Sequence, residues 1–163
     1  MERKNKGYTG LEQALANIRR YCSYQERCHL EVKEKLFEMG MYPKQVDEII
    51  SGLISDNYLN EERFAMQFAG GKFRIKKWGR NKIAYALKQK QVSPFLVKQA
   101  LKSIDNVEYL ELFEKTAEEK WVALKGERNI FTKKAKLRNF LMQRGFESAH
   151  ILDWLKQKQG VTP

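Results

Sequence analysis

Residues 32–50 read VKEKLFEMGMYPKQVDEII, and the same pattern returns at 83–101 and 137–155. The second stretch is IAYALKQKQVSPFLVKQAL, 51 positions downstream, and the third is LRNFLMQRGFESAHILDWL, 105 positions downstream of the first. Apolar residues match across the three copies, and the first offset also aligns Pro43 with Pro94. Because a proline matches as well as the apolar positions, we infer an internal repeat.

Within each copy the apolar residues recur at intervals of three and four, as on amphipathic helices. Gly40 and Gly145 each follow such a run, where the residue just past a helix end needs a positive φ. Ser93 before Pro94 is typical of a helix start, and Tyr42 before Pro43 is a weaker version of it. Each copy is preceded by another helical segment, near 9–22, 60–75 and 107–125.

The sequence therefore predicts an all-α protein of three tandem three-helix repeats. Since each unit is too small to bury much surface alone, we expect the units to stack into an elongated, curved modular array. The expected boundaries are an N-terminal tail at 1–8, repeats at 9–57, 58–105 and 106–158, and a C-terminal tail at 159–163.

The net positive charge is confined to the middle copy. Between Arg63 and Ile104 there are 11 basic residues and no Asp or Glu, whereas the flanking segments hold 20 basic and 20 acidic residues. The formal net charge of +11 thus lies on the middle third. Because a field of one sign costs self-repulsion, we expect an anionic partner there rather than a merely solvated surface.

The sequence shows no metal-binding or catalytic motif. Cys22, Cys28 and His29 lack the further nearby ligands that a zinc site needs, and we interpret both cysteines as idle thiols. The chain contains no phosphate-binding loop, nucleophile elbow or H-E-x-x-H sequence. We therefore expect no enzyme, no cofactor and no metal.

The sequence also bears on location. No run of 18 apolar residues occurs, and the polar start MERKNKGYTG lacks the apolar core of a secretion signal. Two cysteines are too few for a disulfide framework. We expect a cytoplasmic monomer without a membrane contact.

Two stretches of the middle copy resemble a known family. DNYLNEERFAMQFA (56–69) and KKWGRNKIAYALKQKQV (76–92) are similar to the central signature of the RecX family, bacterial regulators of the RecA recombinase. The signature has an aspartate, a tyrosine–leucine pair, an E-R-F-A helix start and a glycine before a basic helix. FLMQRGF (140–146) resembles the closing motif of the family.

The resemblance implies three tandem three-helix units that bind in the groove of the RecA–DNA filament and inhibit strand exchange and ATP hydrolysis. It places the chain in DNA repair by homologous recombination and in the SOS response. One departure is Gln91, where the family often has glycine at the end of the second helix of the middle unit. We expect that turn to be strained or differently shaped.

We expect the partners to be a RecA-type recombinase filament and single- or double-stranded DNA. Phe64 and Phe68 are spaced as core residues, whereas Trp78 and Tyr85 are candidates for a surface role. On a helix beginning near Arg80, Lys82 and Lys88 are expected to face outward. The candidate binding residues are the basic side chains of the middle copy: Lys72, Arg74, Lys76, Lys77, Arg80, Lys82, Lys88 and Lys90.

Two alternatives stay open at this point. The helix–turn–helix at 83–104 has the form of a sequence-specific DNA reader, although the same unit recurs three times with very different charge. The chain could also be a scaffold that binds an acidic protein and no DNA.

Overall fold

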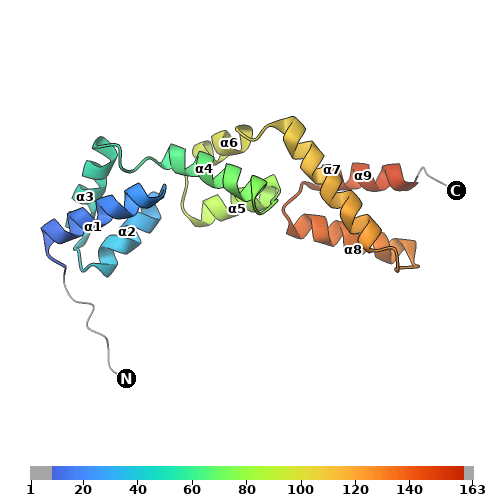
Figure 1. Ribbon diagram of the computed structural model, residues 1–163, viewed down its shortest axis with the longest axis horizontal. Helices are drawn as coiled ribbons and strands as arrows, with labels where there is room; N and C mark the ends of the chain where they lie inside the picture. The colour runs from blue at the N-terminus through green and yellow to red at the C-terminus, as the bar shows by residue number, and fades with distance from the viewer. Residues whose placement is uncertain (1–8, 160–163) are drawn as a thin grey trace, which may run out of the picture. The chain divides into compact units, whose positions relative to one another are not determined.

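Figure 1 shows the computed structural model, which describes residues 9–159. The predicted tails at 1–8 and 159–163 lie outside that range, apart from Gln159, which ends the last helix. Residues 9–159 form nine helices and no strand, which confirms the all-α prediction. In chain order they are α1 (Leu11–Tyr24), α2 (His29–Glu38), α3 (Pro43–Ser55), α4 (Glu61–Arg74), α5 (Arg80–Gln89), α6 (Pro94–Lys102), α7 (Asn106–Ala123), α8 (Ile130–Gln143) and α9 (Ser148–Gln159).

The packing divides the chain into two compact units. The first is Met1–Gln67 with Leu87–Val97, and the second is Phe68–Ala86 with Lys98–Pro163. Each unit therefore holds part of the middle copy of the repeat, because the division passes through α4, α5 and α6. None of the helices described is both long and apolar enough to cross a membrane.

The core of the first unit is aliphatic. α1, α2 and α3 turn one apolar face inward, and Ile18, Val32, Leu36 and Val46 are completely buried there. Burial of each such side chain contributes about 1.5–3 kcal/mol. Cys22 belongs to this core, so its position is explained by packing.

The core of the second unit is aromatic. The ring of Tyr109 on α7 stacks on Phe73 of α4 at a centroid distance of 5.9 Å. It also lies 5.8 Å from Phe146, which in turn lies 5.3 Å from Phe113. Contacts of this kind add about 0.5–1.5 kcal/mol each beyond burial.

The turn after the second helix has the same geometry in all three copies. Gly40 (φ 86°), Gln91 (φ 59°) and Gly145 (φ 91°) have a left-handed backbone. In each copy this residue donates its N–H to the carbonyl three positions back, and the next residue donates to the carbonyl five positions back. That pair of bonds is the Schellman motif, whose accompanying apolar positions are all buried: Leu36 and Met41, Leu87 and Val92, Leu141 and Phe146.

The helix starts also follow the sequence signals. Ser93 Oγ accepts from the N–H of Leu96 at 3.3 Å, and α6 begins at Pro94. The carboxamide oxygen of Asn60 accepts from the N–H of Arg63 at 2.9 Å at the start of α4. Both caps satisfy N–H groups that a helix start leaves without partners.

Within the second unit, the loop after α4 is fixed by a backbone contact at Gly79. Its N–H donates to the carbonyl of Arg144 at 2.7 Å, and the N–H of Asn81 donates to the carbonyl of Gly145 at 2.9 Å. A Cβ on Gly79 would lie 2.4 Å from the carbonyl of Gly145 and from the nitrogen of Phe146. Only glycine permits this approach, which explains why a glycine precedes the basic helix.

We predict that Gln91→Gly stabilises the protein. A non-glycine side chain in the left-handed region costs about 1–2 kcal/mol, and glycine removes that cost while losing some entropy on folding. The free energy of unfolding in urea should rise by about 0.5–1 kcal/mol. The matched control, Gln89→Gly at the end of α5, should lower it instead, since Gln89 is helical. A loss of stability in both variants would contradict the strain at Gln91.

We also predict that Gly79→Ala destabilises the protein by about 2–3 kcal/mol, because the new methyl group must displace the turn at Gly145. Gly71→Ala in α4 is the control. A Cβ there meets no atom within 4 Å, so alanine should stabilise the helix by about 0.5–1 kcal/mol. Chemical denaturation of both variants measures the difference, and equal effects would contradict the close contact.

Candidate functional site

Five basic residues lie between the last turns of α4 and the first turn of α5, before and after Trp78 in the sequence. We call this set the basic cluster, and it comprises Lys72, Arg74, Lys76, Lys77 and Lys82. All of these residues lie in the second unit. Lys76 and Lys77 are exposed in the loop, and Lys77 has a left-handed backbone with φ 58°. The N–H of Trp78 donates to the carbonyl of Lys72 at 3.1 Å and closes the loop.

Trp78 contacts two of the cations of the cluster. The ammonium nitrogens of Lys72 and Lys82 lie 4.9 Å and 4.6 Å from the centroid of its ring. Lys82 is half-buried in this contact, so it faces outward less fully than expected. The indole ring is also half-buried, and it holds two positive charges near the loop.

The basic cluster has no acidic counterpart in the part of the chain that the structure describes. No carboxylate oxygen lies within 4.0 Å of a nitrogen of Lys72, Arg74, Lys76, Lys77 or Lys82 among residues 9–159. Its positive potential is therefore not cancelled by ion pairs. Such a surface attracts phosphates or clustered carboxylates, and the attraction weakens as salt is added.

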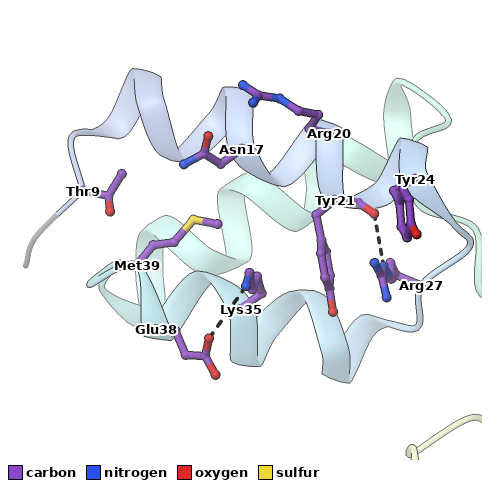
Figure 2. Close-up of a pocket in the computed structure, with 9 residues that line it drawn as sticks. All are labelled: Thr9, Asn17, Arg20, Tyr21, Tyr24, Arg27, Lys35, Glu38 and Met39. Atoms are coloured by element: carbon purple, nitrogen blue, oxygen red, sulfur yellow. Dashed lines mark hydrogen bonds and ion pairs between the residues drawn. The ribbon is translucent and has the colours of Figure 1, made fainter. Parts of the chain in front are cut away.

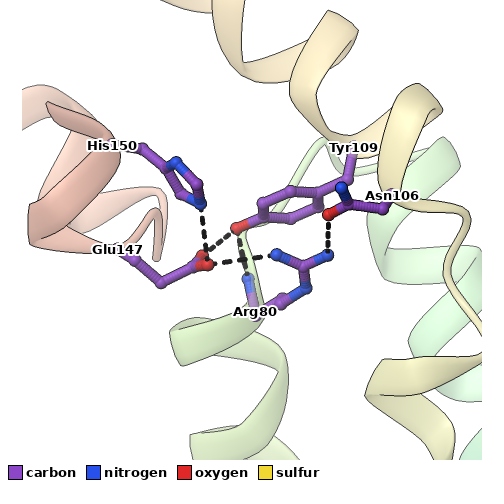
Figure 3. A network of polar contacts seen from close by, with 5 residues as sticks. All are labelled: Arg80, Asn106, Tyr109, Glu147 and His150. Carbon is purple, nitrogen blue, oxygen red and sulfur yellow. Dashed lines mark hydrogen bonds and ion pairs between the residues drawn. The ribbon is translucent and has the colours of Figure 1, made fainter. Parts of the chain in front are cut away.

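Arg80, another predicted binding residue, is instead part of an internal network (Figure 3). Its guanidinium pairs with Glu147 at 3.1 Å, donates to Asn106 at 3.1 Å and lies 3.7 Å from the centroid of the Tyr109 ring. Its backbone N–H donates to the hydroxyl oxygen of Tyr109 at 3.0 Å. This residue joins the start of α5 to α7 and to the turn before α9.

Glu147 is the centre of the same network. It accepts a hydrogen bond from the hydroxyl of Tyr109, and its carboxylate lies 3.4 Å from Nε2 of His150. Burial and the bond to Glu147 raise the pKa of Tyr109 well above its ordinary value. The phenol thus stays protonated and acts as a donor. Nothing in this network is placed to react with a substrate, and its contacts serve to hold α5 in position.

Lys88 and Lys90 lie in Leu87–Val97, a segment of the middle copy that belongs to the first unit. Lys90 Nζ pairs with Glu31 at 2.8 Å, and this hydrogen bond raises the pKa of Lys90. Lys88 is exposed, as expected. Lys90 therefore stabilises the first unit, whereas Lys88 is accessible to solvent.

The sequence did not identify the partners of Arg80 and Lys90. Glu147 is 67 positions from Arg80, and Glu31 is 59 positions from Lys90. No local spacing marks either pair. The glycine at 79 was the one signal of close packing in this region.

Possible reactive groups elsewhere are buried or scattered. Cys22 and Cys28 are free and buried, and burial raises the pKa of Cys22 to about 11. Burial also raises the pKa of Cys28. Thiolates are the reactive form, so both thiols are held in the unreactive one. In residues 9–159, no three His, Cys, Asp or Glu side chains gather as metal ligands would.

Comparison with known proteins matches the same repeats. The family model for the second three-helix domain of RecX matches residues 60–101, and that for the third three-helix domain matches residues 107–155. These two matches cover more than half of the chain. They confirm the three-helix repeats that the sequence predicted, in the middle and last copies.

Individual relatives agree with this assignment. "Regulatory protein RecX" of Pelodictyon phaeoclathratiforme is 32% identical over 126 residues, which are 77% of this chain and 76% of that protein. "Regulatory protein RecX" of Clostridium perfringens (strain 13) is 34% identical over 118 residues, or 72% of this chain and 55% of that protein. The chain spans about a third to just over half the length of the first curated relatives that it matches.

A solved structure shares the fold. The crystal structure of RecX from Lactobacillus salivarius superposes with a TM-score of 0.79 at 22% sequence identity, over 90% of this chain and 94% of that one. The repeats, the helical fold and the sequence relatives lead to one assignment. This chain belongs to the RecX family of regulatory proteins.

Proposed function

We propose that this chain regulates a RecA-type recombinase by binding its filament on DNA, and that it does so without enzymatic activity. The observation that carries the proposal is the basic cluster, whose five cations have no carboxylate partner among residues 9–159. Membership of a family of regulatory proteins supports the same role. The proposed place of action is the cytoplasm, in DNA repair by homologous recombination and the SOS response.

In this proposal the anionic partner is the phosphate backbone of the DNA, single- or double-stranded, or an acidic surface of the filament. Lysines bind phosphates as compact charges and do not read base sequence. A monomer lodged in the groove would compete with the contacts that strand exchange and ATP hydrolysis require. The expected result is inhibition of the recombinase.

The predicted binding residues fall into two groups under this proposal. Lys76 and Lys77 are exposed in the loop, and they would be the first of the cluster to meet a partner. Arg80 and Lys90 would support the surface through their pairs with Glu147 and Glu31. Arg80→Glu is therefore a poor probe of binding, because it would place two carboxylates together.

We predict that the double variant Lys76→Glu, Lys77→Glu binds DNA-bound recombinase at least about tenfold more weakly near 0.1 M salt. The slope of log affinity against log salt should fall by about 2, since two phosphate contacts are lost. The ATPase rate of the recombinase on single-stranded DNA, measured with substoichiometric amounts of this protein, should be less inhibited than with the unchanged chain. Fluorescence anisotropy on filaments gives the affinities.

The control is Lys33→Glu with Lys44→Glu, which removes the same charge from exposed positions of α2 and α3. This variant should bind nearly as well as the unchanged chain, apart from the weak effect of net charge. Equal losses in both double variants would mean that net charge alone matters. If the protein without substitutions leaves the ATPase rate of the recombinase unchanged, the proposed function is refuted. If it selects a defined sequence motif from random duplexes, a sequence-specific DNA reader is favoured.

A further inference from the structure

A second cationic surface lies far from the basic cluster in the sequence, on the first copy of the repeat. A hollow of about 600 Å³ opens between α1 and α2 (Figure 2). It belongs entirely to the first unit. Nine residues line it: Thr9, Asn17, Arg20, Tyr21, Tyr24, Arg27, Lys35, Glu38 and Met39.

The hollow is positive although its copy of the repeat, residues 9–57, has six basic and eight acidic residues. Three of its lining residues are basic and only Glu38 is acidic. Lys35 lies 4.0 Å from Glu38, whereas no carboxylate approaches Arg20 or Arg27 within 4.0 Å among residues 9–159. The two guanidinium groups thus keep their charge uncompensated.

Two acids of the first copy, Glu26 and Glu31, form ion pairs with residues outside the hollow. Glu26 pairs with Arg63 at 2.9 Å, and Glu31 pairs with Lys90 at 2.8 Å. Both carboxylates lie close to lining residues in the sequence, but their partners come from α4 and from the turn after α5. The acidic balance of the first copy therefore hides a local excess of positive charge.

The hollow also contains two tyrosine rings, and one of them, Tyr21, contacts Arg27. The guanidinium of Arg27 lies 3.7 Å from the centroid of the Tyr21 ring, and its Nε donates to the Tyr21 carbonyl at 3.1 Å. These contacts hold the planar group without using its two terminal nitrogens in any ion pair. Figure 2 shows Tyr24 beside Arg27, and Tyr24 is 83% exposed.

A held guanidinium presents a fork that fits a phosphate, and an exposed aromatic ring offers a face on which an unpaired base can stack. We propose that the hollow binds single-stranded nucleic acid, with a phosphate at Arg27, a base on Tyr24 and the phosphate of a neighbouring nucleotide at Arg20. Arg20 and Tyr24 are at the open rim, so one nucleotide gains little enclosure. Useful affinity then requires successive nucleotides of one strand, which excludes a free mononucleotide as the main ligand.

A single strand fits these residues better than the other polyanions. The bases of a duplex are stacked on each other and cannot cover Tyr24. An acidic peptide would use the guanidinium groups and leave the ring exposed. The inference rests on the proposed function only in the class of partner, because the residues involved are different.

The test uses the full chain and a thymidine oligonucleotide of about 20 nucleotides that contains one 2-aminopurine, a fluorescent base. Arg20→Ala with Tyr24→Ala should weaken binding roughly tenfold and reduce the change in 2-aminopurine fluorescence on binding. Both residues are exposed, so the fold should be preserved, which circular dichroism would verify. Tyr24→Phe should keep the fluorescence change, since stacking needs the ring and not the hydroxyl.

Arg19→Ala is the matched control for charge. Arg19 is the neighbour of Arg20 on α1, but it lines a different hollow, with Glu48 and Asp56. It should retain nearly the affinity of the unchanged chain. Equal binding by the Arg20, Tyr24 double variant and by Arg19→Ala would overturn the proposal.

Further arms separate the other outcomes. Thymidine monophosphate should compete only at far higher concentration than the oligonucleotide, and equal competition would overturn the choice of a strand. A polyglutamate peptide should not distinguish the double variant from the control; if it alone does so, the site is one for acidic protein and the proposal fails. The oligonucleotide titration is then repeated with Lys76→Glu and Lys77→Glu added both to the Arg20, Tyr24 double variant and to the Arg19→Ala control. This comparison makes the result independent of the basic cluster.

Discussion

The backbone contact of Gly79 with the turn at Gly145 determines how the second unit presents its charge. Three N–H groups at the start of α5 are used in this contact or beside it: Gly79 donates to Arg144, Arg80 to Tyr109 and Asn81 to Gly145. A helix N-terminus is a common anion site, but this one is occupied by carbonyl and hydroxyl oxygens of the protein itself. An anion near the start of α5 would therefore have to be bound by side chains. Two exposed ones, Lys76 and Lys77, lie in the loop before Gly79.

The same contact divides the basic residues by role. Arg80 follows Gly79 directly, so its side chain is carried into the space between Tyr109 and Glu147, where it is half-buried and paired. Lys76 and Lys77 precede Gly79 by three and two residues and are exposed. Breaking the half-buried pair would leave Glu147 without its main cation, which costs more than losing an exposed lysine. Charge in this segment is thus paired and half-buried after the glycine, and exposed before it.

Much of the fold could be predicted from the sequence because its signals are local. The Schellman turns at Gly40 and Gly145 follow from apolar spacing and a glycine. Gln91, which the resemblance marked only as a departure from the family pattern, forms a turn of the same geometry and not a different one. The division of roles among the cations could not be predicted, because Arg80 and Lys76 look alike until distant partners are known. The hollow on the first copy was missed for a related reason. Charges summed along a segment cancel, whereas Glu26 and Glu31 turn toward other helices and leave Arg20 and Arg27 uncompensated.

The two cationic surfaces differ in the chemistry that each favours. Lysines dominate the basic cluster, and its tryptophan is half-buried beneath Lys72 and Lys82, so it responds mainly to charge density. The hollow has arginines and an exposed tyrosine, which is why unpaired bases are proposed for it and not for the cluster. Under the two proposals, phosphates alone suit the first surface, whereas phosphates together with unpaired bases suit the second.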